Sequence, residues 1–241
     1  MTPELELKVL CLLDVLGFES LFKAIGLEAM KERYTKLTEY VKEQTGGIDL
    51  VPTPDGHVAI GWLVIGNEYF SDTLLFWTKY SKISLPSFTQ LIAETICWGL
   101  EHQLPLRGTI AVGEAILDSE SHTYLGQPII EAARTEGAQE WIGVSFGPSF
   151  LVPDFNNGFY LHTILPYKSH YKDKTSAYAS GITVDWPRKW RETRTTDLPT
   201  LVSTMDTDTR FSEYYKKTLD FIAFSESNHD WFKKQGHMNY G

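Results

Sequence analysis

Cysteine is scarce in the chain, and its two cysteines, Cys11 and Cys97, both lie in apolar runs. Two cysteines cannot build the multi-bridge framework that staples small secreted domains. Neither has a zinc-ligand partner nearby, and the seven histidines include no pair four residues apart, as a zincin would need. We therefore expect buried, reduced thiols, and histidines with structural or surface roles.

Long apolar segments are missing as well. The first eight residues contain no basic region followed by a small-residue cleavage site, so we expect no signal peptide. The longest N-terminal apolar run, residues 9–18, is too short to span a bilayer and contains Asp14. No repeat, low-complexity tract or Pro/Gly/Ser-rich linker is found. These absences predict a single domain over residues 1–241 that is cytoplasmic and has no membrane partner.

Positive charge is also in short supply, because 22 Lys and Arg stand against 31 Asp and Glu, for a net charge of −9. A field of that sign repels a phosphate backbone, so we do not expect a nucleic-acid groove. The same field repels a nucleoside triphosphate. An enzyme of this charge that acts on phosphates would therefore need metal cations to bridge the two anions.

The chain does contain an ordered series of strand and helix patterns. Apolar residues recur at helical spacing over residues 19–44 and 87–103, and a third helix is expected from Gly126 to about Gln139. Strands are expected over residues 5–14, 57–69, 72–80, 106–117, 141–146 and 159–165. This order predicts an α+β fold, a ferredoxin-like βαββαβ sandwich with its core at about residues 7–165. Residues 167–204 give no clear pattern, and a helical C-terminal addition is expected over about residues 209–234, within an extension of about 166–241.

Two acids occupy unusual places in this pattern. Asp14 closes a buried strand just before Gly17, and a desolvated carboxylate is costly unless a cation or a hydrogen-bond donor pairs with it. A metal ion would serve, but so would the first amides of the following helix if Asp14 capped it. Asp72 lies at the expected hairpin, where it is either a ligand or an ordinary turn residue.

Four segments become specific through their order and spacing: Asp14 to Phe18, Asp72 in FSDT, Arg107 to Gly113, and Gly126 to Glu136. Together they resemble the catalytic domain of class III nucleotidyl cyclases, over roughly residues 7–165. The forms FSDT and IIEAARTE are similar to the bacterial pyrimidine cyclases of Pycsar anti-phage defence. The resemblance implies production of a cyclic nucleotide that acts on a separate effector protein.

The resemblance also implies roles for residues of the first two segments. Asp14 and Asp72, with the carbonyl of Val15, would hold two Mg²⁺ or Mn²⁺ ions, which prefer hard oxygen ligands. The ions would activate the ribose 3′-hydroxyl and stabilise the leaving pyrophosphate. The backbone N–H groups that would bind phosphate belong to Leu16, Gly17 and Phe18.

In the fourth segment, the resemblance gives Arg134 the task of stabilising charge on the α-phosphate. The alternative for Arg134 is a weak surface pair with Glu131. Class III active sites lie between two subunits. The resemblance therefore implies a homodimer in which Arg134 comes from one chain and the aspartates from the other.

Three positions depart from the family pattern. Ile130 replaces a transition-state asparagine, Glu68 replaces an adenine-selecting lysine, and Thr123 replaces the second base-selecting acid. An ionised Glu68 accepts hydrogen bonds, from uracil N3–H, cytosine N4–H₂ or guanine N1–H, so adenine is disfavoured. UTP or, second, CTP is favoured as the substrate by the family resemblance and not by any of these residues. The departures leave open a guanylate cyclase, a nucleotide-binding dimer without turnover, and a surface role for Glu68.

Other candidates give weaker signals. Ser145 lies in Gly143-Val144-Ser145-Phe146-Gly147, and we do not expect it to be the nucleophile of a nucleophile elbow. Lys168, Lys172 and Lys174 could approach a triphosphate, but a basic solvated loop is the simpler interpretation.

Overall fold

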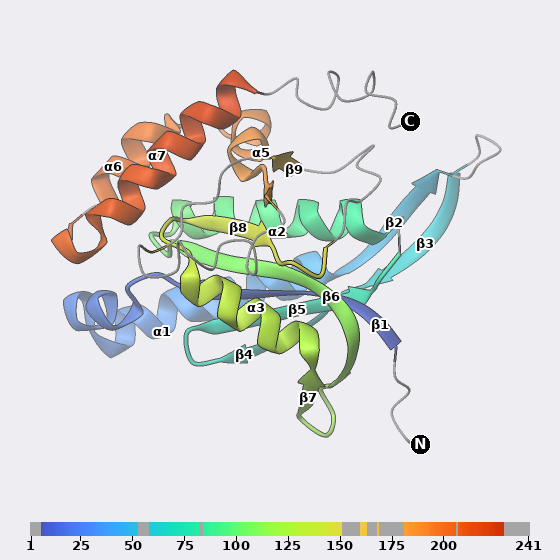
Figure 1. Cartoon of the computed structure of the whole chain (residues 1–241). Coiled ribbons are helices and arrows are strands. Elements are labelled where there is room, and N and C mark those ends of the chain that lie inside the picture. Colours follow the sequence, from blue (N-terminus) through green and yellow to red (C-terminus); the bar gives the residue numbers. More distant parts are fainter. Residues whose placement is uncertain are drawn as a thin grey trace.

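The structure is a computed structural model, and it describes residues 6–52, 58–81, 84–150, 160–162, 168, 181–205 and 207–228. Of residues 46–52, 58–64, 160 and 162 it describes the backbone alone. A twisted sheet forms the middle of the molecule, with helices on both of its faces (Figure 1). Within the described ranges, no helix is both long and apolar enough to cross a membrane.

The first half of the chain forms the predicted βαββαβ core. Its elements are β1 (Glu6–Val15), α1 (Phe18–Thr45), β4 (Gly66–Phe70), β5 (Thr73–Lys79), α2 (Ser84–Glu101) and β6 (Leu106–Asp118). In the sheet they stand in the order β4-β5-β1-β6, and β1 is antiparallel to both of its neighbours. This order and these directions are those of a ferredoxin-like sheet, so the predicted α+β class is confirmed.

The later elements widen the sheet and cover it. They are β7 (Thr123–Gly126), α3 (Gln127–Ala138), β8 (Gly143–Phe146), β9 (Tyr160–His162) and β10 (Ile182–Val184). Strand β8 pairs with β6 in parallel, and β10 and β9 follow it to the edge. Strand β7, which the sequence patterns did not predict, pairs with the far end of β6.

One expected strand is divided in two. The predicted strand over residues 57–69 is split into β3 (Val58–Val64) and β4, which belong to different sheets. Strand β3 pairs with β2 (Gly46–Pro52) in a two-stranded ribbon that points away from the main sheet (Figure 1). An apolar sequence does not show which strand its residues will pair with. The division between β3 and β4 therefore could not be predicted from the sequence. Of the strand expected over 159–165, the ends lie outside the described residues.

The alternation of side chains along β1 determines which residues meet which helices. Val9, Cys11 and Leu13 pack in the large core with α1 and α2, whereas Leu10 and Leu12 face α3 in a smaller core. Because successive strand residues point to opposite faces, Asp14 lies on the α3 face. Both cysteines are buried free thiols, as expected, and burial raises the pKa of each.

The C-terminal part is helical, as predicted, and its first two helices lie in the described end of the stretch that gave no clear pattern. It contains α5 (Trp186–Thr193), α6 (Leu198–Met205), the 3₁₀ turn η2 (Thr209–Phe211) and α7 (Ser212–Ser227). Helix α7 therefore ends before the predicted boundary, and residues 229–234 lie outside the described ranges. Trp186 and Trp190 are almost fully buried, so this stretch serves packing.

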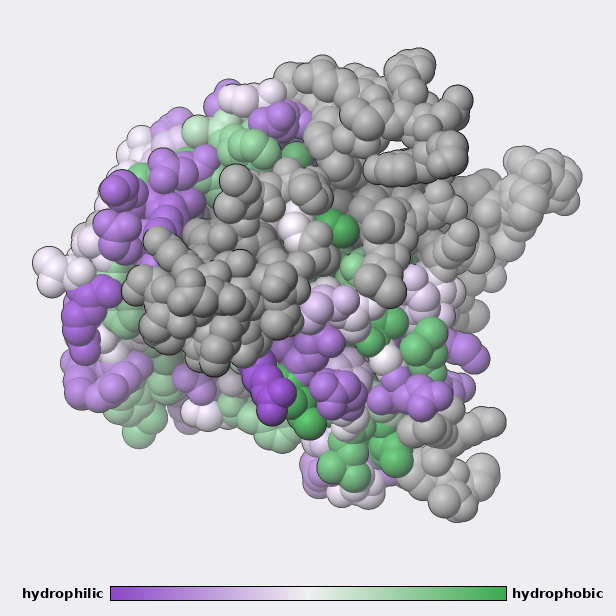
Figure 2. Space-filling model, viewed as in Figure 1, coloured by the Kyte–Doolittle hydropathy of each residue, from purple (hydrophilic) through white to green (hydrophobic). Residues whose placement is uncertain are grey.

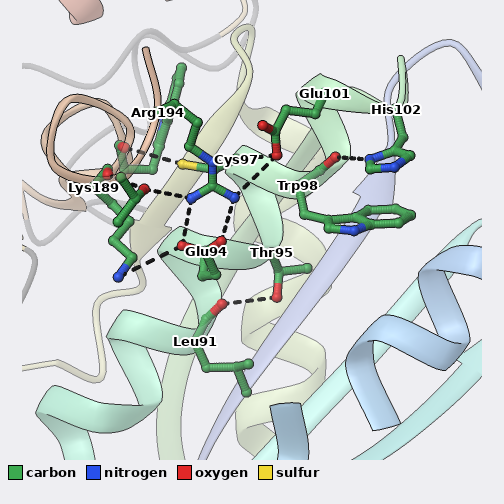
Figure 3. Close-up of polar contacts among 11 residues, drawn as sticks. Leu91, Glu94, Thr95, Cys97, Trp98, Glu101, His102, Lys189 and Arg194 are labelled. Carbon is green, nitrogen blue, oxygen red and sulfur yellow. Dashed lines mark hydrogen bonds and ion pairs between the residues drawn. The ribbon is translucent and has the colours of Figure 1, made fainter. Parts of the chain in front are cut away.

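A cluster of charges fastens the C-terminal helices to α2. The guanidinium of Arg194, just after α5, donates to Glu94 at 2.7 Å and to Glu101 at 3.2 Å (Figure 3). Lys189 lies 3.7 Å from the same Glu94 carboxylate. A forked arginine–carboxylate pair with little exposure orients its partners more strictly than an ordinary surface pair does.

Gln139 joins the end of α3 to β6 and is fully buried. Its side-chain amide donates to the Gly108 carbonyl at 2.9 Å and to the Thr109 hydroxyl at 2.8 Å, and it accepts from the Trp141 indole at 2.6 Å. Gln139→Ala leaves these buried groups without partners, so we expect the free energy of unfolding to fall by about 3 kcal/mol. Urea unfolding measures this, with exposed Gln90→Ala on α2 as the control. A loss no larger than the control's would contradict this role of Gln139.

Candidate active site

Asp14 and Asp72 meet at one end of the sheet. Thr73, which follows Asp72, lies opposite Asp14 in the register of β1 and β5. The amide of Val15 donates to the Asp72 carbonyl at 3.2 Å, and the two aspartate side chains interact, since the Asp72 carboxylate raises the pKa of Asp14 through its charge and a side-chain hydrogen bond. Folding thus brings together the two acids that the sequence singled out.

The surroundings of Asp14 are unfavourable for its negative charge. Burial and the charge of Glu136 raise the pKa of Asp14 to about 7, Arg107 opposes this, and Asp72 adds to it. Helix α1 begins four residues later, at Phe18, and none of its amides donates to Asp14 among the described contacts. Asp14 is therefore not the cap of that helix. The positive charge of Arg107 does not fully offset the burial of the Asp14 carboxylate and its acidic neighbours.

Arg107 is the cation of this site, although the sequence assigned it no role beyond its motif. It lies opposite Asp14 in the register of β1 and β6, and its Nη2 is 3.6 Å from Asp14 Oδ2. The Nε atom pairs with Glu136, and Nη1 donates to the Gln139 carbonyl at 3.2 Å. Only strand register shows that Arg107 and Asp14 are neighbours, and register cannot be read from one chain's sequence.

A glycine turn links β1 to α1 beside the two acids. Gly17 has φ +70°, a conformation that side-chain-bearing residues avoid, and its carbonyl accepts from Leu21 at 2.9 Å. The Leu16 amide already donates to the Pro105 carbonyl at 2.8 Å. The amides of Gly17 and Phe18 have no acceptor among the described residues, and phosphate binding by the three amides stays a prediction.

Arg134 lies on the outward side of α3, away from the aspartates of its own chain. Its side chain is exposed and forms no ion pair within the described part of the protein. The alternative partner, Glu131, instead accepts from the Ser149 amide at 2.9 Å. The same surface carries Ile130, 46% exposed, and Leu125 on β7, 60% exposed. Figure 2 shows apolar groups of this kind among charged ones over α3 and β7.

Glu68 lies on β4 and accepts a hydrogen bond from the hydroxyl of Tyr124 on β7. His122 Nδ1 is 4.0 Å from the same carboxylate, which is 23% exposed. The Thr123 hydroxyl instead accepts a hydrogen bond from the Ser121 hydroxyl at 2.9 Å. The structure therefore joins Glu68 to Tyr124 rather than to Thr123. Successive side chains of β7 point to opposite faces of the sheet, so Tyr124 faces Glu68 and Thr123 does not. The sequence patterns did not predict β7.

Among the predicted lysines, only Lys168 falls within the described residues. Its Nζ donates to the Gly137 carbonyl at 2.7 Å, at the end of α3. Burial and the charge of Arg107 lower the pKa of Lys168, which also feels the charges of Glu136 and Asp14. It is therefore part of the charged cluster around Asp14. Lys172 and Lys174 lie outside the described ranges.

The donor set at the two aspartates suits a hard divalent cation. Two carboxylates in contact, one with a raised pKa, would be relieved by positive charge, and Mg²⁺ and Mn²⁺ prefer such oxygens. The described residues contain no cluster of three or more His, Cys, Asp or Glu side chains fit for a metal. Further ligands would have to come from backbone, water or substrate, as is usual for Mg²⁺ bound with phosphates.

The raised pKa of Asp14 predicts a pH-dependent cost. A carboxyl whose pKa is higher in the folded state stabilises the fold below about pH 4, and this stability is lost as the pH rises through about 7. Without metal, Asp14→Asn should therefore melt at a higher temperature than the wild type at pH 8 and at nearly the same temperature at pH 4.5. Thermal unfolding in EDTA at both pH values measures this, with exposed Asp220→Asn as the control. A difference that does not grow with pH would contradict the assignment.

Comparison with known proteins gives limited similarity. No family model and no curated protein matches the chain. Among solved structures, a bacterial light-regulated adenylyl cyclase aligns over 61% of this chain and 78% of its own, with 16% identity and a TM-score of 0.42. The guanylyl cyclase Cya2 aligns over 60% of this chain and 77% of its own, also with 16% identity and a TM-score of 0.42. This similarity is too low to assign an activity.

Proposed function

We propose that the protein is a nucleotidyl cyclase that converts UTP, or less readily CTP, to the 3′,5′-cyclic nucleotide and pyrophosphate. The observation that carries this proposal is the contact between Asp14 and Asp72, which are far apart in the sequence and meet beside a glycine turn. The product would serve as a second messenger for an effector in anti-phage defence. That role depends on the family resemblance of the four motifs.

The reaction is an in-line displacement at the α-phosphorus. The ribose 3′-oxygen forms a bond to this phosphorus, its proton goes to water, and the bond to the α,β-bridging oxygen breaks to release pyrophosphate. Two bound Mg²⁺ or Mn²⁺ ions would lower the pKa of the hydroxyl and neutralise charge on the leaving group. Asp14, Asp72 and the Val15 carbonyl would hold these ions. Bound by these residues, the ions would also overcome the repulsion between this acidic protein and its substrate.

The groups next to the aspartates can bind the triphosphate. The Gly17 and Phe18 amides lie at the start of α1, where a helix favours anions. Arg107 has five N–H donors, more than its contacts with Asp14, Glu136 and the Gln139 carbonyl use, so donors remain for a phosphate oxygen.

Arg134 would act from a second subunit, because it lies on the outer face of α3 in its own chain. The apolar residues beside it suit burial in a homodimer interface: Leu125, Ile130 and Phe70, the last 46% exposed. A dimer with twofold symmetry would use the same surface of both chains and form two equivalent composite sites.

The base is proposed to bind near Glu68, on the same sheet face as Asp14. Tyr124 donates to the Glu68 carboxylate, so Glu68 acts as an acceptor and keeps lone pairs for an N–H of the base. This environment supports uracil, cytosine or guanine over adenine. We place uracil first, on the family resemblance.

Incubation with Mn²⁺ and each of the four nucleoside triphosphates, followed by mass spectrometry, tests the proposal. We expect cUMP as the main product, less cCMP, and little or no cAMP. If cGMP were the main product, the substrate would be GTP, and the proposed preference for a pyrimidine base would be wrong. Ile130, which has no polar group where the family uses asparagine, favours a second candidate, a dimer that binds nucleotide without turnover. Binding with no cyclic product from any triphosphate would establish that candidate instead.

A further inference from the structure

The beginning of the C-terminal helix reaches the candidate site, although it lies about two hundred residues after Asp14 in the chain. A Cβ built on Gly17 would come within 3.1 Å of the Phe211 ring of η2. The Phe211 ring packs edge-on against Tyr214, the third residue of α7, with centroids 5.7 Å apart. The extension thus contributes a wall to the glycine turn.

Tyr214, which contacts Phe211, also contacts Arg107. The central guanidinium carbon of Arg107 lies 5.7 Å from the centroid of the Tyr214 ring, and the tyrosine is 9% exposed. A guanidinium over an aromatic face is held by the ring's quadrupole, more strongly when the pair is desolvated. Arg107 is itself only 13% exposed. Asp14 and Glu136 hold it by charge, and Tyr214 adds a contact with its ring.

Other contacts hold α7 in place independently of Arg107. The Thr218 hydroxyl accepts from the Ile142 amide at 2.8 Å and donates to the Tyr214 carbonyl at 2.7 Å. Lys217 forms an ion pair with Glu140, just after α3. Tyr214 therefore stands on a helix that is anchored to the segment between α3 and β8, so its ring is a fixed surface.

We propose that Tyr214 is a positioning residue that keeps the Arg107 guanidinium beside Asp14, where it can bind a metal-bound triphosphate. This inference rests on the proposed function, which places phosphates at Asp14 and Arg107. It gives the C-terminal extension a part in the site that the sequence motifs do not assign. Without the ring, Arg107 keeps its contacts with Asp14, Glu136 and the Gln139 carbonyl but loses the surface that limits its movement, so the cation is positioned less strictly.

The test measures binding of inorganic triphosphate with Mn²⁺ by calorimetry, so it depends on neither the base nor turnover. Tyr214→Leu should raise the Kd about tenfold, as the loss of a largely buried cation–ring contact predicts. Tyr214→Phe keeps the ring and should stay within about threefold of the wild type. Arg194→Gln, which loosens the extension at α2 instead (Figure 3), should bind as the wild type does.

A double variant separates positioning from general stability. In an Arg107→Gln background, Tyr214→Leu should cause no further loss of affinity, since the ring acts through the guanidinium. Equal losses in both backgrounds, or equal losses for Tyr214→Leu and Arg194→Gln, would overturn the inference. If Tyr214→Leu bound triphosphate as tightly as the wild type, the inference about Tyr214 would be wrong. The proposed function would still stand if the protein made a cyclic nucleotide. A wild type that binds no triphosphate would overturn the inference whatever the nucleotide assay gives.

Discussion

Asp72→Asn is expected to lower the rate of cyclic-nucleotide formation by about 10³-fold. Metal ions contribute several kcal/mol of charge stabilisation in such reactions, and each 1.36 kcal/mol is a factor of ten in rate. The change removes one of the two carboxylates that meet at the end of β1, and nearly conserves its shape. Initial rates with Mn²⁺ and the preferred triphosphate measure the effect.

The fold should survive this substitution, because the neutral amide that replaces the Asp72 carboxylate does not repel Asp14. Asp220→Asn, on the exposed side of α7, makes the same charge change at a residue with no part in the proposed site and should keep full activity. Asp72→Asn should melt no lower than the wild type in the absence of metal. If Asp72→Asn kept more than about a tenth of the wild-type rate, metal-assisted chemistry at this pair would be excluded.

Mixing two inactive variants is expected to restore activity. Asp14→Ala and Arg134→Ala should each lose at least about 10²-fold in rate, because one removes a metal ligand and the other a cation at the α-phosphate. After subunit exchange, half of the dimers are mixed and each has one intact composite site. The mixture should therefore regain about a quarter of the wild-type activity.

The control for this experiment is a mixture of Asp14→Ala with Asp72→Ala. Both aspartates lie in the same half of the proposed site, as their contact within one chain shows, so neither half is intact in the mixed dimer and no activity should return. Recovery in this control, or no recovery in the first mixture despite proven exchange, would contradict the composite site. Native mass spectrometry of differently tagged chains measures the exchange.

Much of the fold could be predicted because its core elements carry strong patterns. The apolar spacing of α2 and the βαββαβ order both correspond to what forms. The sequence patterns predicted less where the place of a strand depends on which other strand it pairs with. The sequence does not predict the short strand β7, and the apolar run through Ile65 predicts one strand although its halves pair with different partners.

The candidate site was predictable in its acids but not in Arg107, the cation that lies beside Asp14. Asp14 stood out because a carboxylate closes a buried strand, and Asp72 because it precedes one. Arg107 gave no such signal, since its importance comes from lying opposite Asp14 in the pairing of β1 with β6. Tyr214 belongs to a helix nearly 200 residues from Asp14, and no local pattern relates the two.

The most direct test of the account is a crystal grown with Mn²⁺ and a UTP analogue whose α,β-bridge cannot be cleaved. Anomalous scattering at the manganese edge locates the ions independently of the protein density. The account predicts two peaks at the end of β1, each coordinated by oxygens of Asp14 or Asp72 and by the phosphates. Peaks elsewhere, with the two carboxylates still paired to each other and to Arg107, would contradict it.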